Sequence, residues 1–376
     1  MNHTAGSSTP LPAPRRVMWG NCAFTAFLRL LTRNRWAVDR ERRFALGRAL
    51  LESGLSSTLG VLETIRHGWA VHGAALREPP LFVLGHWRSG TTYLHDLLAL
   101  DPRFSYPTSY ECFVPLHFLL SEDFMMRRAA PQGGHRSMDN VPTGWDRPQE
   151  DEFALALLGQ PSPYLTLAFP NEAPADPEYL DLESVPAPRR ESWKRTLHHF
   201  LRKVTLKRPG RLVLKSPTHT ARIKILLELF PDAQFLYIVR NPYSVIPSTM
   251  KTMSVLSHNM GLQEPNLRTL EDYTFDNYRR MFQHLEDGRR LVPAERFFEL
   301  RYEELARDPV GQVKSAYDHL KLGDFEASLR PRLEAYLASL GTYQPNQHHL
   351  PPALSAAIAK NCGAVLEQYG YHGDPA

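Results

Sequence analysis

A short loop bounded by glycines carries the residues of this chain best suited to bind an anion. The loop runs from Gly85 to Gly90, after the apolar stretch 81–84 and before Thr91-Thr92. Glycine at both ends permits φ > 0, so the loop amides and the amino end of a following helix can point at one anion. Arg88 adds a guanidinium fork that suits phosphate or sulfate. The segment therefore predicts a buried strand, an anion-binding loop and a helix.

The loop departs from the phosphate-binding loop of nucleoside triphosphatases at one position. In their pattern, G-x-x-x-x-G-K-[ST], the lysine would stand where this chain has Thr91. Without that lysine, no cation reaches the β- and γ-phosphates of a metal-bound triphosphate. The loop instead favours a nucleotide with a single 5′ anion chain.

A second apolar stretch, 234–239, ends in a cation. Arg240 follows it, then a helix started by proline, and Ser248 comes eight residues after the arginine. A triphosphatase would keep an aspartate at such a strand end to hold Mg²⁺. Two anion-binding elements on one sheet edge predict a nucleotide with two separate phosphates.

Together these elements resemble the nucleotide-binding segments of sulfotransferases that use 3′-phosphoadenosine 5′-phosphosulfate (PAPS). The similarity covers roughly residues 80–306, and the arginine in the loop is closer to the tyrosylprotein and bacterial branches than to the cytosolic animal enzymes. It implies that the loop grips the 5′-phosphosulfate and that an arginine and a serine grip the 3′-phosphate. The nucleotide-binding residues that it assigns are Arg88, Ser89, Gly90, Thr91, Thr92, Arg240, Ser248 and Tyr302.

The resemblance also implies a set of catalytic residues. Lys215 ends the apolar stretch 211–215, where the family places a lysine near the transferring sulfuryl group. Arg88 is expected to hold the 5′-phosphate during transfer. Catalysis of sulfuryl transfer would then consist mostly of positioning and charge stabilisation, as in phosphoryl transfer.

The general base is harder to place. Pro217 occupies the position of the catalytic histidine of the cytosolic animal enzymes. In the tyrosylprotein branch the base is a glutamate soon after the first helix, which makes Glu111 the candidate, although it comes about two residues late. Asp151 and Glu152, ahead of an apolar helix, are the alternative, but acids there also suit simple helix capping.

Other functions compete with this interpretation. A nucleotide or small-molecule kinase with a degenerate loop would require Mg²⁺, and a non-catalytic nucleotide-binding protein would keep the fold without the chemistry. The resemblance to sulfotransferases implies PAPS as co-substrate and no metal. It leaves the acceptor open among hydrophobic alcohols, phenols, lipids, sugars and protein tyrosines.

Composition indicates a globular protein with either one large domain or one domain that carries an appendage. The 376 residues are 43% hydrophobic and 22% charged, with a formal net charge of +4. No basic run with interleaved aromatics suggests nucleic acid. Three widely spaced cysteines suit a reducing compartment and predict a cytoplasmic protein, whose oligomeric state the sequence does not indicate.

The alternation of apolar stretches and helical patterns predicts an α/β fold, a P-loop-like parallel sheet flanked by helices. Residues 1–16 form a polar, proline-rich tail that we expect to be disordered. Residues 17–78 should form a helical N-terminal segment, with a helix at 39–76 broken at Gly54. The core then spans 79–306, including an irregular lid insertion at about 107–211, and 307–376 should be helical.

One segment near the N-terminus raises the question of membrane contact. Residues 17–35 mix large apolar side chains with arginines, so they could form an interfacial helix or simply pack onto the core. The uncharged run within them is too short to span a bilayer.

Overall fold

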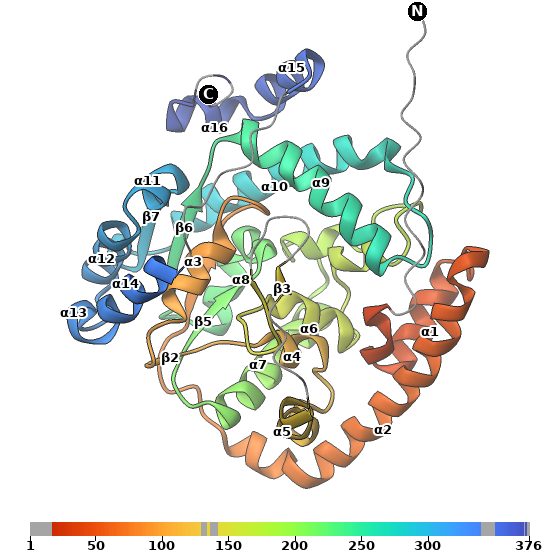
Figure 1. Ribbon diagram of the computed structural model, residues 1–376. Helices are drawn as coiled ribbons and strands as arrows, with labels where there is room; N and C mark the ends of the chain where they lie inside the picture. Colours follow the sequence, from red (N-terminus) through yellow and green to blue (C-terminus); the bar gives the residue numbers. More distant parts are fainter. Residues whose placement is uncertain (1–16, 129–133, 136–141, 340–349, 372, 374–376) are drawn as a thin grey trace, which may run out of the picture.

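The computed structural model in Figure 1 is built around a five-stranded parallel sheet. It describes residues 17–128, 134–135, 142–339, 350–371 and 373; the predicted tail 1–16 lies outside them. The strand order is β2-β5-β1-β6-β7, and all four pairings are parallel. The strands of the sheet are β1 (Leu81–Leu84), β2 (Phe104–Ser105), β5 (Arg211–Lys215), β6 (Gln234–Val239) and β7 (Phe297–Arg301).

Helices surround this sheet, and several of them carry the candidate functional residues. They are α1 (Phe24–Arg33), α2 (Arg43–Gly73), α3 (Thr91–Leu98), α4 (Ser109–Phe113), α5 (Phe118–Arg128), α6 (Asp151–Leu157), α7 (Ala187–Lys207), α8 (Ile223–Leu229), α9 (Pro242–Met260), α10 (Leu270–Arg289), α11 (Tyr302–Arg307), α12 (Pro309–Leu320), α13 (Phe325–Ser328), α14 (Arg330–Ser339), α15 (Pro352–Asn361) and α16 (Gly363–Tyr369). The described chain also has a small hairpin, β3 (Gly134–His135) with β4 (Pro142–Thr143), and 3-10 turns that include η3 (Pro163–Leu167) and η5 (Pro217–Ala221).

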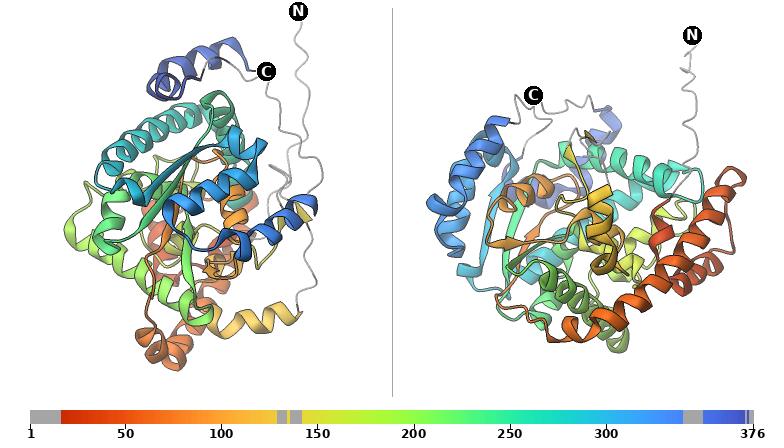
Figure 2. Two further views of the ribbon diagram at one scale, coloured as in Figure 1. Left: turned by 90° about the vertical axis from the view of Figure 1, so that its left-hand side faces the viewer. Right: turned by 60° about the horizontal axis from the view of Figure 1, so that its bottom comes forward.

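Strand β1 shows why the central strands are continuous apolar runs in the sequence. All four of its residues are fully buried, because helices cover both faces of the sheet. Leu81 and Val83 pack in the cluster that contains α3 and α12, whereas Phe82 and Leu84 pack in the larger cluster that contains α8 and α10. Figure 2 shows the helices distributed on both sides of the sheet. The predicted α/β class is therefore confirmed.

Two expectations about helices were wrong. The helix predicted to break at Gly54 continues through it, and α2 is 31 residues long without interruption. The region 107–211 is less irregular than its prolines indicated, because it contains α4, α5, α6 and the 21-residue α7. Proline is tolerated at the start of α7, since the first helical turn needs no amide donor there.

The N-terminal segment packs onto the core. Trp19, Phe27 and Leu31 are fully buried, and Ala23 donates a backbone hydrogen bond to Leu157 of α6. The sequence left open whether residues 17–35 form an interfacial helix or pack onto the core. The buried side chains favour packing onto the core. In the part of the chain that the structure describes, no helix combines the length and apolar character needed to cross a bilayer.

Candidate active site

The predicted anion loop joins the carboxyl end of β1 to the amino end of α3. Gly90 caps α3 with φ 105°, and a Cβ there would lie 2.4 Å from the Tyr302 ring. Gly85 has φ 152°, and a Cβ there would come within 2.8 Å of the carbonyl oxygen of Ile238. Both positions therefore require glycine, because a side chain would collide with the neighbouring strand or helix.

Residues from two separate segments meet the loop at this edge of the sheet. The Arg88 Nε donates to the Ser248 Oγ at 3.0 Å, and the Arg240 Nη1 donates to the Arg88 carbonyl at 3.3 Å. The Arg240 guanidinium also stacks 4.0 Å above the Tyr302 ring. The structure thus brings together four of the predicted nucleotide-binding residues, and it concentrates two cations beside a helix amino terminus.

The hydroxyl residues of the loop have different environments. The Ser89 Oγ donates to the His86 carbonyl at 2.8 Å and is buried, so it braces the loop. Thr91 is buried in the first turn of α3, whereas Thr92 is partly exposed. Burial lowers the pKa of His86 to about 4, which keeps this imidazole neutral.

Lys215 lies beside the loop and is paired with a glutamate that the sequence analysis did not select. Lys215 ends β5, and its register partner on β1 is Val83, two residues before Gly85. Its Nζ lies 2.6 Å from the Glu150 Oε1. The Lys215 side chain is 2% exposed, and that of Glu150 is 15% exposed. The cation at the strand end therefore faces a carboxylate that solvent can still reach.

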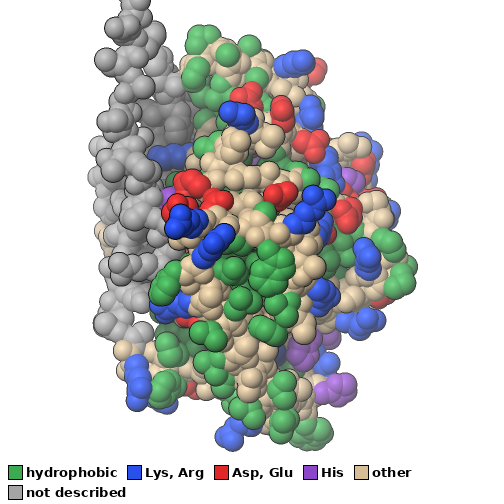
Figure 3. Space-filling model, turned by 90° about the vertical axis from the view of Figure 1, so that its right-hand side faces the viewer, with side chains coloured by type: hydrophobic (Ala, Val, Ile, Leu, Met, Phe, Trp, Pro, Cys, Tyr) green, Lys and Arg blue, Asp and Glu red, His purple; other side chains and the backbone are tan. Residues whose placement is uncertain are grey.

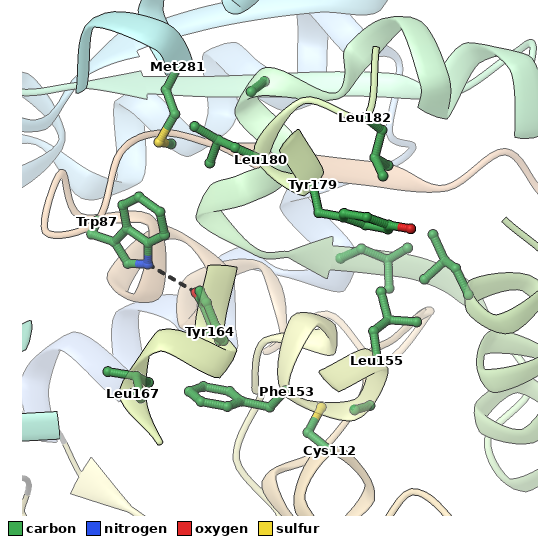
Figure 4. Packing of buried hydrophobic residues seen from close by; sticks show 14 of the residues in the cluster. Trp87, Cys112, Phe153, Leu155, Tyr164, Leu167, Tyr179, Leu180, Leu182 and Met281 are labelled. Atoms are coloured by element: carbon green, nitrogen blue, oxygen red, sulfur yellow. Dashed lines mark hydrogen bonds between the residues drawn. The ribbon is translucent and has the colours of Figure 1, made fainter. Parts of the chain in front are cut away.

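A hydrogen-bonded chain connects this ion pair to the loop. The Tyr164 hydroxyl donates to the Glu150 Oε2 and accepts from the Trp87 Nε1 at 3.0 Å. Figure 4 shows the tyrosine and tryptophan meeting across the core. Burial and the nearby charge of Glu150 hold the pKa of Tyr164 well above its usual value, so it stays a donor. Both Glu150 oxygens are thus engaged by fixed donors.

A cavity of about 480 Å³ opens next to this chain. Trp87 and Tyr164 line it, together with the segment 163–174, α9 and residues 266–276. Most of the lining is apolar, with Leu167 and Met253 among the side chains that contribute. The cavity is large enough for part of a small-molecule or lipid substrate.

Asp151 and Glu152, the alternative bases, are not among the residues that line that cavity, and both are fully buried. The Asp151 Oδ2 lies 2.8 Å from the His219 Nε2, and the Glu152 Oε2 lies 2.5 Å from the Arg222 Nη1. Burial opposes the ionisation of Asp151, but the charge and hydrogen bonds of its partners hold its pKa below the usual value. These contacts anchor the start of α6 to the segment that follows Lys215.

Glu111 occupies a third environment. It forms a reciprocal capping box with Thr108 at the start of α4, and its Oε2 lies 2.5 Å from the Arg208 Nη2. The side chain is fully buried, and burial raises its pKa to about 7 against the lowering charge of Arg208. The structure does not bring Glu111 together with Lys215 in a hydrogen bond or ion pair, and its role as base stays a prediction.

One feature of the sequence could have pointed to Glu150, the site residue that was not predicted. Glu150 directly precedes the two acids that the sequence analysis considered, at the amino end of the same helix. Helix geometry turns consecutive side chains by about 100°, so three acids in a row cannot share one environment. The pattern indicates that one of them differs, but not which one.

Comparison with known proteins identifies the class of this site. A model described as the sulfotransferase family matches residues 79–326. The chain belongs to the sulfotransferase family. Two relatives, one from Mycobacterium bovis and one from Mycobacterium tuberculosis, carry the name omega-hydroxy-beta-dihydromenaquinone-9 sulfotransferase Stf3. Each is 46% identical over 355 residues, which cover 94% of this chain and 91% of the relative.

Solved sulfotransferases share the fold. Sulfotransferase STF9 from Mycobacterium avium superposes with a TM-score of 0.68 at 19% identity, covering 95% of this chain and 98% of that one. Sulfotransferase STF1 from Mycobacterium tuberculosis H37Rv gives a TM-score of 0.59 at 21% identity, covering 86% and 90%. The family match and the 46% identical relatives show that the protein is a sulfotransferase, and they favour this activity over the kinase and non-catalytic alternatives.

Proposed function

We propose that this sulfotransferase moves the sulfuryl group of PAPS to the terminal hydroxyl of a long apolar lipid alcohol. The donor half of the proposal rests on the edge of the sheet around Gly90. There a glycine cradle closed by Tyr302, a helix amino terminus and two arginines offer donors for two anionic groups. Arg88, Ser89, Gly90, Thr91 and Thr92 would hold the 5′ side, and Arg240, Ser248 and Tyr302 the 3′ side.

The acceptor half rests on the cavity and on the relatives. The 46% identical relatives are named for a hydroxylated dihydromenaquinone, which is a lipid with a polar terminus. In this chain the apolar cavity reaches Trp87 and Tyr164, and these residues lead directly to Glu150. The observation that carries the proposal is that Tyr164, in the wall of a mostly apolar cavity, donates its hydroxyl hydrogen bond to Glu150 of the ion pair beside the anion loop. Such a cavity suits a long apolar chain with a hydroxyl at its end.

Glu150 is the residue best placed to accept the proton of that hydroxyl. It is the carboxylate of the four candidates that pairs with Lys215, and it alone among them retains side-chain exposure. In the transfer, the acceptor oxygen forms a bond to sulfur while the bond from sulfur to the 5′-phosphate oxygen breaks. The acceptor proton passes to the Glu150 carboxylate, and the phosphate oxygen leaves with the electron pair.

Lys215 would stabilise the charge that develops during this step. Its ammonium is buried at the end of β5, next to the loop, where water screens charge poorly. The ion pair holds the carboxylate and the ammonium close together, so base and cation can act on the two oxygens on either side of one sulfur.

Asp151 and Glu152 would act as positioning residues for Glu150. The Ser216 Oγ donates to the Asp151 Oδ1 at 2.8 Å, and the Glu152 amide donates to the Ser216 Oγ at 3.1 Å. Ser216 directly follows Lys215 in the chain. These bonds therefore fix the start of α6 to the end of β5, and they set the distance between Glu150 and Lys215.

We also propose that the protein works in the cytoplasm. Cys22, Cys112 and Cys362 are buried free thiols. Burial raises the pKa of Cys22 to about 12, which makes it a poor nucleophile. Structural thiols of this kind suit a reducing compartment.

A transfer assay with radiolabelled donor tests the proposed function. Purified protein is incubated with PAPS labelled in the sulfuryl group and with an ω-hydroxylated polyprenyl quinol in detergent; the same lipid without the ω-hydroxyl is the matched control. We expect label in the hydroxylated lipid alone. Label in neither lipid, or equal label in both, would contradict the proposed acceptor.

The same assay separates sulfuryl transfer from a kinase reaction. Turnover should survive a metal chelator, because Thr91 stands where a kinase loop has its lysine, and Arg240 follows β6 where a kinase strand would end in an acid. Complete loss of turnover in chelator, restored by Mg²⁺, would favour the kinase hypothesis.

A further inference from the structure

The long helix α2 presents a stripe of large apolar side chains to the outside of the molecule. Twelve large apolar side chains are exposed in the described residues, and eight of them lie between Trp36 and Trp69. The stripe on α2, defined here as the outer stripe, consists of Phe44, Leu51, Leu55, Leu62, Ile65 and Trp69. Trp69 is 92% exposed and Leu51 is 79% exposed, so nothing in the described chain covers them.

The spacing shows that the outer stripe is one continuous surface. Its members follow one another at intervals of three, four or seven residues, which places them on the same face of a helix. The opposite face, with Ala45, Ala49 and Ser53, is buried against the core. Figure 3 shows hydrophobic side chains gathered on this side of the molecule. A continuous apolar patch of this extent on the solvent-exposed surface of a protein marks an interaction site.

The charges beside the outer stripe have one predominant sign. Between residues 34 and 73, the exposed charged side chains are Arg35, Arg40, Arg43, Arg48, Arg66 and Glu41. Large apolar side chains bordered by arginines are typical of helices that lie in the interface of an anionic membrane. The arginine heads would meet lipid phosphates while the apolar side chains enter the acyl boundary.

A second copy of the chain fits the outer stripe less well. If two copies of α2 paired antiparallel along the stripe, symmetry would bring Arg48 of one copy close to Arg66 of the other. Like charges so placed repel, and Glu52, which lies 2.9 Å from Arg48, is a single acid that offsets this repulsion only in part.

The segment that precedes α2 lies close to the wall of the substrate cavity. Trp36 is 48% exposed, and the carbonyl of the next residue, Ala37, accepts a bond from the Gln263 Nε2 at 2.9 Å. The Gln263 Oε1 in turn accepts from the amide of Asn171, which lines the cavity. A lipid that leaves a bilayer under α2 would therefore have a wall of the cavity close to the amino-terminal end of the helix.

We propose that the outer stripe of α2 docks this enzyme onto an anionic lipid bilayer, from which the acceptor enters the cavity. The docking surface differs from the predicted contact through residues 17–35, whose large side chains support the core. The proposal rests on the proposed function for the identity of the acceptor, but the binding itself does not depend on it.

Vesicle co-sedimentation tests the docking directly. We use vesicles of phosphatidylcholine with about 30% phosphatidylglycerol, and vesicles of phosphatidylcholine alone. The wild type should sediment with the anionic vesicles. The variant Leu51→Gln/Leu55→Gln/Ile65→Gln/Trp69→Gln should bind about tenfold or more weakly, since it loses most of the apolar contact without a change in charge. Leu291→Gln, at a leucine that is 55% exposed outside the stripe, should bind as wild type.

Two further measurements separate the outcomes. Sulfation of a detergent-dispersed hydroxylated lipid should be unchanged in the quadruple variant, whereas sulfation of the same lipid embedded in vesicles should fall with binding. Failure of the wild type to bind anionic vesicles would overturn the docking proposal even if the detergent assay succeeds.

Self-association is the alternative role of the outer stripe. A concentration-dependent dimer in sedimentation velocity that the quadruple variant abolishes, with no vesicle binding, would also overturn the docking proposal and assign the stripe to self-association. Vesicle binding without sulfation of any lipid alcohol would leave docking intact and reject the proposed acceptor.

Discussion

The nucleotide side and the acceptor side of this site are built in different ways. On the proposed nucleotide side, the loop from Gly85 to Gly90 directly follows β1, and Arg240 directly follows β6, with Ser248 in the next helix, α9. On the proposed acceptor side, the Glu150 carboxylate reaches Lys215 across 65 positions of sequence, which include α6 and α7. The first side is encoded in short motifs, whereas the second depends on how distant segments pack.

Exchange of the proposed base should have the largest effect. Glu150→Gln keeps the shape of the side chain but removes the proton acceptor, so turnover should fall by roughly a hundredfold or more, with nucleotide affinity unchanged. Glu111→Gln is the matched control, because its carboxylate serves a capping box and Arg208. Steady-state rates of both variants show whether Glu150 or Glu111 is the general base. An inactive, folded Glu111→Gln beside a fully active Glu150→Gln would reverse the assignment.

Loss of the strand-end cation should be nearly as severe. Lys215→Ala should lower kcat by about a hundredfold, the usual scale for removal of one preorganised group that stabilises developing charge, and should change nucleotide affinity less. Lys215→Arg is the control that keeps the charge. Kinetics at saturating donor, together with calorimetric nucleotide binding, separate the two effects. A variant that loses affinity and keeps kcat would place Lys215 in binding alone.

A change on the nucleotide side should affect binding and spare chemistry. Arg240→Ala removes a cation proposed to hold the 3′-phosphate, so affinity for adenosine 3′,5′-bisphosphate should fall roughly ten- to a hundredfold. Affinity for adenosine 5′-monophosphate should hardly change, because it lacks the 3′-phosphate. Thermal shifts report both affinities. If the variant still prefers the bisphosphate as the wild type does, the 3′ assignment of Arg240 is wrong.

The central strands and the proposed nucleotide-binding cluster could be predicted from the sequence. The strands β1, β5 and β6 were predicted with their observed bounds, because each is an apolar run that stops at a polar or glycine residue. The cluster of Arg88, Arg240, Ser248 and Tyr302 followed from the family motifs, since parallel strands end at the same edge of the sheet.

The rest could not be predicted, for physical reasons. The sequence does not show which of three consecutive acids faces Lys215, because that depends on the angle at which α6 begins. Helix α7 was missed because the prolines before it signalled a loop, although proline is also accepted in a first helical turn. The outward apolar face of α2 was unrecognised because periodicity alone does not tell which face meets the core.

The smallest expected effect concerns stability at the buried Glu111. Its folded pKa of about 7 lies above the ordinary value of 4.5, so the folded state holds this proton more tightly than the unfolded state. This group therefore favours folding at low pH, and its contribution declines as the pH rises from about 4.5 to 7. Glu111→Gln should flatten that decline by roughly 1–3 kcal/mol, measured by urea unfolding. An unchanged pH dependence would show that Glu111 does not titrate in this range.

The claim that Glu150 is the general base is tested most directly by varying the acidity of the acceptor hydroxyl. Two lipid alcohols of equal length are compared, one of which carries fluorine atoms next to the terminal hydroxymethyl group and loses its proton more readily. We predict that Glu150→Gln slows transfer to the ordinary alcohol by about a hundredfold, and that the loss is several times smaller for the fluorinated one, because a more acidic hydroxyl depends less on a base. An equal loss for both alcohols would contradict proton acceptance by Glu150.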